Sequence, residues 1–343
     1  MAFTVNNILT VYPVDRELGG VPGFTQAVTN QGGNLIPLAL PSDLTAGREL
    51  YRKLCWRISD SNNGTGAESI IRKWKEISGQ YAYSCFFPVT RKFLNSEITG
   101  TEDKYGSGIL KNAVLSTDTQ IVVTYRSSNL ATGPDAVAKD TYNISICAAD
   151  QDPTADDALQ VKKTIDGTPS VNGVDITITL DSAIGRDFDA GALVQTYPAA
   201  VDIATAKSNK VVTSSAGTFD LDAVTLSNVG TPTGQITLTF TSATNYNATC
   251  DFPGGIVDPA GSSSLGGTQA ISAQFQPLNR FNSSPVLTIP VAAFGGTFVS
   301  GDTVTFDIEG AEFCFVEKHT IPASSVSVSG DYEDYVLQTA SVS

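Results

Sequence analysis

The sequence predicts a mainly β protein with a middle block that has the strand spacing of a β-sandwich. Three observations lead to this prediction. Apolar and polar residues alternate over many short segments, which is the period of a strand. Glycine, proline, asparagine and aspartate mark turns between these segments. Two linkers, 100–108 and 254–270, bracket a middle block whose strands recur at about the 8–12-residue spacing of a sandwich.

The clearest strand patterns lie near the C-terminal end. Apolar and polar residues alternate over 303–308, directly after a Gly301-Asp302 turn. The next segment, Phe313–Lys318, is largely apolar on both faces, which is typical of a strand inside a sheet. Pro322 ends it, because proline cannot donate to a strand ladder. These strands are expected to hold the end domain together.

The N-terminal part is rich in turns. Short strands are expected at Phe3–Tyr12 and Leu35–Leu40, as edge strands rather than as an extended arm on a neighbouring molecule. Residues Gly47–Ile58 fit either a helix or a strand. A strand with several aromatic residues is expected at Tyr81–Thr90.

A short helix is predicted over residues 67–78. Thr65-Gly66-Ala67-Glu68 matches the capping box that begins many helices. Apolar residues follow at helical spacing, with a basic face between them that is expected to be solvated. These apolar residues are Ile70, Ile71, Trp74 and Ile77.

The middle block carries a series of alternating segments and one further helical signal. Thr154 is suited to cap a short helix, Ala155–Lys163, and residues 188–206 are partly helical in pattern. The two linkers mark the middle block, residues 106–267, as a separate β-rich domain. Strands are expected at Thr119–Tyr125, Thr141–Ala148, Val174–Leu180, Lys210–Thr213, Phe219–Ser227 and Gln235–Ser242.

Composition excludes several classes of partner. The chain has 343 residues, enough for two or three domains with separate cores. Its formal net charge is −14, and an acidic surface repels nucleic-acid phosphate. No basic region precedes a long apolar run, and no segment has the ~20 apolar residues of a membrane span. We therefore expect a soluble protein with no signal peptide and no nucleic-acid or membrane partner.

The five cysteines match no zinc-binding spacing. An odd and scattered set in a chain of this length is typical of buried apolar thiols. We expect all five to be reduced, because the chain is made in a cytosol that keeps thiols reduced. They stand at positions 55, 85, 147, 250 and 314.

The sequence contains no convincing catalytic constellation. His319 is the only histidine, and no G-x-S-x-G motif accompanies it, so we expect a strand residue rather than a catalytic base. The acidic loop Asp150–Asp157 lacks the order of a calcium loop and is expected to be a solvated turn. Asp187 and Asp189 could act as paired glycosidase carboxylates, but such spacing is common by chance. No enzyme activity, cofactor or metal is expected.

Three aromatic residues in loop-like segments allow a binding function. Tyr197, Tyr246 and Phe252 could stack on sugars in a receptor-binding module. We favour a core position for them, since most aromatic side chains are buried.

Both ends of the chain resemble one family. L-G-G-V at 18–21, G-N-L at 33–35 and A-G-R-E-L-Y-R-K-L-C-W-R-I at 46–58 resemble the opening of a group of tailed-bacteriophage virion proteins. Those openings run L-G-G, then N-L-F, then a Gly-x-x-x-Y-R strand. In that family the segment after Y-R is also a strand, which differs from the helix expected at 67–78.

The C-terminal part resembles the ending of the same proteins. There a G-D turn precedes a strand, and an aromatic strand then leads to a basic residue and a P-A or T-A-G turn. Here these are Gly301-Asp302, Phe313–Lys318 and Ile321–Ser324. The sequence departs from the family in this region, because Phe315 and His319 stand where the family often has a tryptophan and an arginine.

The resemblance covers about residues 15–60 and 280–335. It implies that residues 1–105 and 268–343 form one antiparallel β-sandwich, a discontinuous docking domain into which residues 106–267 are inserted as a second β-sandwich-like domain. It also implies a non-enzymatic structural protein of a tailed-phage particle. It would be a repeated subunit of the tail, baseplate or neck, assembled in the cytoplasm of the bacterial host. The implied partners are other virion proteins and further copies of the chain, in a homo-oligomer such as a trimer or hexamer. The alternative is a receptor-binding, adhesin or capsid-decoration module on the virion surface.

Overall fold

The structure is a computed structural model of the chain, and its regular structure is almost entirely β-strand. Every pairing between strands is antiparallel in the described part, which confirms the predicted mainly β fold. No described helix is long and apolar enough to cross a membrane. The structure describes residues 8–13, 22–26, 46–58, 67–75, 83–91, 94–125, 133, 135–148, 160–199, 201–202, 204–251, 256–257, 267–279, 283–321, 323 and 334–341.

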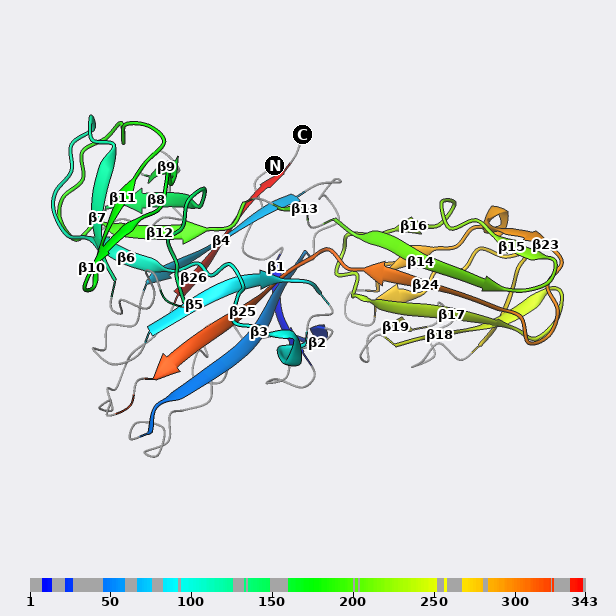
Figure 1. Cartoon of the computed structure of the whole chain (residues 1–343). Helices are drawn as coiled ribbons and strands as arrows, with labels where there is room; N and C mark the ends of the chain where they lie inside the picture. The colour runs from blue at the N-terminus through cyan, green and yellow to red at the C-terminus, as the bar shows by residue number, and fades with distance from the viewer. Residues whose placement is uncertain are drawn as a thin grey trace.

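The strands form three units that lie in a row (Figure 1). Two small sheets occupy the middle, a barrel lies at one end and a sandwich at the other. Both chain ends lie at the middle, and the barrel and the sandwich are formed by residues between them. The two outer units are therefore consecutive insertions into the central one.

A five-stranded sheet with the order β2-β1-β3-β25-β5 forms the main part of the centre. Its strands are β1 Ile8–Pro13, β2 Pro22–Gln26, β3 Arg48–Ile58, β5 Tyr83–Val89 and β25 Glu312–Ile321. β25 lies between β3 and β5, and nearly all of its residues are buried, which agrees with the prediction of a strand inside a sheet. The segment that the sequence left open between helix and strand is the strand β3.

The helix predicted over 67–78 is wrong for the residues that the structure describes. Residues Ala67–Lys75 form strand β4 in a second central sheet, with the order β13-β4-β26. β4 pairs along its length with β26, Asp334–Ser341, and at one end with β13, Val201–Asp202. Pairing with a partner far away in sequence thus overrides the local helical signal of the capping box.

The first insertion is a closed barrel. Its sheet has the order β10-β11-β7-β6-β12-β8-β9. Backbone bonds from Asp166 N to Thr179 O and from Asp181 N to Thr164 O join the ends of β9 and β11, so the sheet closes on itself. The strands are β6 Ser107–Leu110, β7 Gln120–Thr124, β8 Asn143–Cys147, β9 Gln160–Thr164, β10 Ser170–Asn172, β11 Asp175–Thr179 and β12 Leu193–Tyr197.

Two helical expectations in this region are not met. Residues 160–163 lie in β9, and β12 lies within 188–206, so both described segments are extended. The rest of the helix expected at Ala155–Lys163 lies outside the described residues.

The second insertion is a β-sandwich. One layer is the sheet β14-β24-β17-β18-β20, and the other consists of three two-stranded ladders. Side chains from both layers share one core, including the closely stacked rings of Phe240 and Phe298 with centroids 3.7 Å apart. The strands are β14 Ala206–Thr213, β15 Gly217–Phe219, β16 Thr225–Leu226, β17 Gly234–Phe240, β18 Asn245–Cys250, β19 Ile256–Val257, β20 Thr268–Ala270, β21 Leu278–Asn279, β22 Leu287–Thr288, β23 Phe294–Gly296 and β24 Thr303–Glu309.

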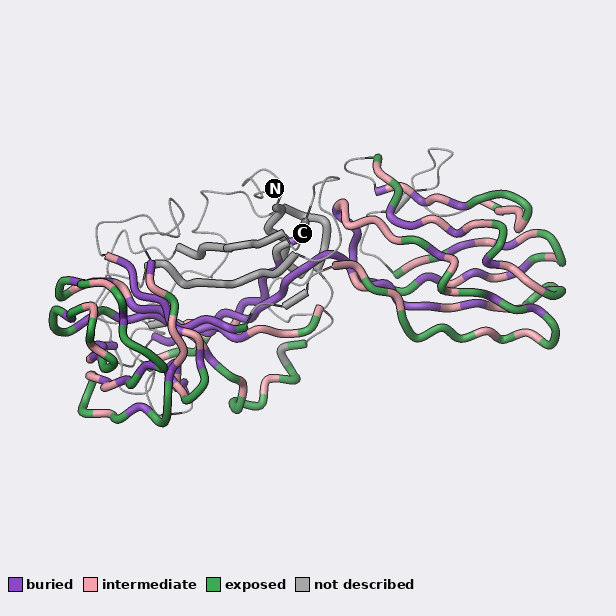
Figure 2. The backbone as a smooth tube through the Cα atoms, turned by 90° about the horizontal axis from the view of Figure 1, so that it is seen from above, coloured by how far each residue is buried: buried purple, intermediate pink, exposed green. Residues whose placement is uncertain are grey.

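Strand pairing divides the chain at points other than the linkers. Residues 268–309, expected in the docking domain, pair with residues 206–250, because β24 lies between β14 and β17. Only Gly310 and Ala311 separate β24 from β25, so the chain passes directly from the sandwich into the central sheet. Figure 2 shows this passage as an almost uninterrupted buried path.

The barrel and the sandwich have separate cores, which gives a testable prediction. Ile178 and Ile236 are fully buried, one in each core. Ile178→Ala should destabilise the barrel by about 2–5 kcal/mol and raise amide exchange there, while the sandwich stays protected. Ile236→Ala should do the reverse. Hydrogen exchange with mass spectrometry measures both effects.

The matched control for this experiment is Val174→Ala, because Val174 is 43% exposed at a turn of the barrel. It should change exchange in neither unit. Equal loss of protection in both units after either isoleucine substitution would contradict separate cores.

Candidate functional site: the polar face of the central sheet

The two central strands β3 and β25 carry charged residues on one shared face. Alternate residues of a strand point to the same face, and β25 pairs with β3 from Glu312↔Arg57 to Ile321↔Arg48. One face therefore carries six ionisable residues together with Val316, Thr320 and the pair Cys55 and Cys314. We call these six residues the polar face: Glu49, Tyr51, Lys53, Arg57, Glu312 and Lys318.

Four residues of the polar face are buried although they carry charge. Arg57, Lys53, Glu312 and Lys318 are each less than 5% exposed. Charged side chains are almost never buried to this extent unless they have partners. Arg57 and Glu312 pair with each other, and Lys53 bonds a carbonyl after β5. The inserted units add contacts from the sandwich at one end of the face and from the barrel at the other.

At the sandwich end, Arg57 and Glu312 form a buried ion pair. Arg57 Nε donates to Glu312 Oε1 at 2.6 Å, and a second guanidinium nitrogen contacts the same oxygen. Thr233 Oγ1 from the sandwich donates to Glu312 Oε2 at 3.3 Å. The carboxylate is thus satisfied from both units, which a buried ion requires.

Arg91, which follows β5, ties the base of the sandwich together. It donates to the Glu312 carbonyl at 3.2 Å and to the Ala204 carbonyl at 3.3 Å, and it pairs with the Glu309 carboxylate. The chain enters the sandwich at Ala204 and leaves it at Glu309, so one side chain holds both crossings. The Arg91 carbonyl in turn accepts a bond from Lys53 Nζ at 2.7 Å.

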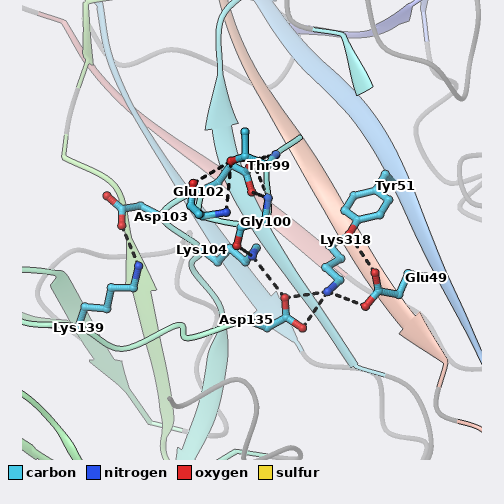
Figure 3. A network of polar contacts seen from close by, with 11 residues as sticks. Glu49, Tyr51, Thr99, Gly100, Glu102, Asp103, Lys104, Asp135, Lys139 and Lys318 are labelled. Atoms are coloured by element: carbon cyan, nitrogen blue, oxygen red, sulfur yellow. Dashed lines mark hydrogen bonds and ion pairs between the residues drawn. The ribbon is translucent and has the colours of Figure 1, made fainter. Parts of the chain in front are cut away.

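At the barrel end, Lys318 lies between two carboxylates (Figure 3). Its Nζ donates to both oxygens of Asp135, at 2.8 and 2.9 Å, and lies 2.8 Å from Glu49 Oε1. Asp135 belongs to the first insertion and is 3% exposed. Lys104, from the segment that leads into the barrel, is equally buried and lies 3.5 Å from Asp135. Tyr51 Oη donates to Glu49 at 3.0 Å.

The segment that leads into the barrel is fixed by its own polar contacts (Figure 3). Glu102 accepts bonds from the backbone amides of Thr99 and Gly100, and Lys104 donates to the Gly100 carbonyl at 3.0 Å. Asp103 accepts a bond from Lys139 at 3.0 Å, which lowers the pKa of that carboxyl. These contacts hold Lys104 in place beside Asp135.

The polar face shifts the pKa values of its residues in opposite directions. Burial alone would lower the pKa of Lys318, but its bonds to Asp135 and Glu49 outweigh burial and raise it. Burial would raise the pKa of Glu49, yet the bond and charge of Lys318 bring it below its usual value. Burial lowers the pKa of Lys53 to about 8, although the charge of Glu312 opposes this.

The candidate catalytic residues of the sequence do not come together. His319 is half-buried on the other face of β25, across from Leu50 and Ser84. Asp187 and Asp189 are exposed in the barrel and flank the buried Phe188. Asp187 accepts a bond from the Ser116 amide at 2.6 Å, which is a turn contact.

The aromatic candidates lie in cores where they are described. Tyr197 and Tyr246 are buried, so the core interpretation is confirmed for both. Phe252 and the acidic loop Asp150–Asp157 lie outside the described residues.

The prediction that all cysteines are reduced is wrong. Cys55 and Cys314 form a disulfide across β3 and β25, while Cys85, Cys147 and Cys250 are free. The two bonded residues are 259 positions apart, so their spacing gave no signal of the pairing. Strand register makes them direct neighbours, with Cα atoms 4.1 Å apart.

The same cysteines belong to the one cluster of possible metal ligands in the described part of the chain. Cys55, Cys314 and Glu312 place ligand atoms within 4.8 Å of one another. The disulfide occupies both sulfur atoms, and Arg57 occupies the carboxylate. Metal binding needs thiolates, so this cluster is not a metal site in the oxidised protein.

Sequence reasoning missed the polar face as a whole. Its signal in the sequence is the presence of Lys53, Arg57 and Lys318 inside segments with strand patterns. Comparison of the sequence with protein-family models gives no match, and comparison with curated proteins gives no significant match. The site is therefore interpreted from its geometry alone.

The disulfide predicts a thiol count. Alkylation of the unfolded protein should modify three cysteines without reductant and five after reduction, as measured by intact mass. The three are Cys85, Cys147 and Cys250. Five modified cysteines in freshly prepared, unreduced protein would contradict the Cys55–Cys314 bond.

The low pKa of Lys53 predicts a pH dependence of stability. The unfolded chain binds this proton up to about pH 10.4, whereas the folded chain releases it near 8. Because the unfolded state binds more protons in this window, stability should rise with pH by at most about 1.4 kcal/mol per unit between them. Urea unfolding followed by tryptophan fluorescence measures it, since Trp56 and Trp74 both lie in central strands.

Lys53→Met should flatten this rise, because methionine keeps most of the volume and does not titrate. Lys139→Met is the control, since the Lys139 side chain is 41% exposed. It should leave the rise unchanged. If stability rises equally steeply with pH in the wild type and in Lys53→Met, the low pKa of Lys53 is contradicted.

Proposed function

We propose that the chain is a non-enzymatic structural protein of a tailed-bacteriophage particle, repeated in the tail, baseplate or neck. The observation that carries the proposal is the use of charge at the polar face. Four charged residues there are buried, and the inserted units contact two of them, because Thr233 of the sandwich bonds Glu312 and Asp135 of the first insertion pairs with Lys318. Groups held in this way fix domains relative to one another. The resemblance of both chain ends to tailed-phage virion proteins supports the same function.

The row of three units fits a spacer or docking role. The central sheets contain both chain ends, and the sandwich and the barrel extend from them on opposite sides (Figure 1). We propose that the central sheets dock the chain in the particle, with other virion proteins and further copies of the chain as partners. A trimer or hexamer matches the rings of phage tails that the resemblance implies.

The outer edge of the sandwich is protected against strand addition, which favours contacts elsewhere. Edge strand β14 has an irregular register between Ser208 and Val211. Lys207 and Lys210 donate to carbonyl groups of Asp222 and Phe219, each at 3.0 Å. Bulges and lysines at an edge are common devices against pairing between chains. Self-association is therefore expected at the central sheets.

The alternative is a receptor-binding, adhesin or decoration module. The observation that favours it is the exposure of aliphatic residues on the sandwich, where Val211, Val291 and Val299 are each about half exposed. A glycan array with the intact protein separates this alternative from a purely structural subunit.

The proposed function predicts the copy number. Purified particles should contain several copies of the chain, in a multiple of three, because virion rings repeat their subunits. Quantitative mass spectrometry against a virion protein of known copy number measures this, and electron microscopy locates the copies. Absence from washed particles, or one copy per particle, would overturn the proposal. A sample of host lysate without phage is the control for carry-over.

A further inference from the structure

We propose that Lys318 and Asp135 become joined by an amide bond between their side chains, which links the central sheet covalently to the barrel. The two residues are 183 positions apart and meet only in the folded chain. The Lys318 amine lies 2.8 and 2.9 Å from the two carboxylate oxygens of Asp135. Both side chains are nine-tenths buried or more. This modification is independent of the proposed function.

The neighbours supply the groups that such a condensation needs (Figure 3). Glu49 lies 2.8 Å from the Lys318 amine and is placed to take a proton from it, and Tyr51 holds the Glu49 carboxylate by a bond of 3.0 Å. This proton transfer is uphill, because the contact raises the pKa of Lys318 and lowers that of Glu49, so the condensation should be slow. The Lys104 ammonium lies 3.5 Å from Asp135 Oδ1, where it stabilises negative charge on that oxygen during attack. Glu49 is about half exposed, so a proton and a water molecule can leave on that side.

The step balances without any co-reactant. Lys318 gives one proton to Glu49, and its free amine attacks the carboxyl carbon of Asp135, so that a carbon–nitrogen bond forms. The tetrahedral intermediate then loses one carboxyl oxygen, and the carbon–oxygen bond breaks. That oxygen leaves as water with two of the three protons of the original ammonium, one of them returned by Glu49. Nothing is oxidised or reduced.

Two physical effects favour the amide here. Groups held in contact reach effective concentrations of about 10⁵–10⁸ M, which offsets the unfavourable condensation in water. Burial of an ammonium and a carboxylate also carries a desolvation cost, which a neutral amide removes. After the step Lys104 and Glu49 remain as one cation and one anion, so the cluster is neutral before and after.

The other buried pair of the polar face cannot react in this way. Arg57 meets Glu312 through a guanidinium that stays protonated and is no nucleophile. The exposed pair Lys139–Asp103 has a similar separation of 3.0 Å, but both side chains are more than 40% exposed. Water therefore competes for the hydrogen bonds of both ions. Only the contact of Lys318 with Asp135 combines an amine, burial and a flanking acid in the described residues.

Intact mass of the full-length protein after reduction and unfolding tests the proposal. The expected mass is lower than the sequence mass by one water molecule, and proteolysis should give one branched peptide that contains Lys318 and Asp135. Lys318→Arg keeps the positive charge but should restore the full mass. The control Lys139→Arg should keep the loss of water.

Glu49→Gln tests the proton acceptor separately, and bond formation in it should be at least about 100-fold slower. Formation as fast as in the wild type would overturn the role of Glu49. A full sequence mass in wild-type protein would show an ion pair only and overturn the proposal, as would a branched peptide at other residues. Since the wild-type mass decides, the result does not depend on whether a variant folds.

Discussion

The pairing of β3 with β25 is the interaction on which the rest of the structure depends. It joins residues more than 250 positions apart and runs in unbroken register from Glu312↔Arg57 to Ile321↔Arg48. The register places Cys55 opposite Cys314 and aligns the residues of the polar face. A shift by one residue would move all of these side chains to the other face. The disulfide fixes the register covalently, and both inserted units dock on the result.

Both insertions must keep their own shape and also keep a fixed position on the central sheets. Each has its own apolar core, although Cys85 of β5 also belongs to the core of the barrel. Polar contacts attach both units at either end of the polar face, where Arg91 ties the two crossings of the sandwich and Asp135 reaches from the barrel to Lys318. The barrel is also joined to β5 by two backbone bonds between Phe86 and Tyr105. Separate cores and polar joints allow the units to fold locally before the long-range pairing of β3 and β25 closes the centre.

Local patterns in the sequence predicted the mainly β class, the strand at 303–308 and the inner position of β25, because alternation is a local property. They did not predict β4, whose strand conformation depends on β26, nor the disulfide, which depends on the register of distant strands. The linker near residue 267 suggested a boundary, but β24 returns to the sandwich after it. The sequence showed the charged residues in the strands of the polar face. It did not show that Asp135 and Lys104 lie beside them.

The use of buried charge at both joints has a physical consequence. The free energy needed to remove the ions from water nearly cancels the free energy gained when they pair. These pairs therefore add little net stability compared with apolar contacts. They do penalise a wrong arrangement of the barrel, since a misplaced barrel would leave Lys318 without Asp135, at about 3–5 kcal/mol. A misplaced sandwich would remove the Thr233 bond from Glu312, whose ion pair with Arg57 lies within the central sheet. Purely apolar contacts would let the units slide on the central sheet at a smaller cost. Such a fixed orientation is what the proposed function, a subunit repeated in a symmetric assembly, would require.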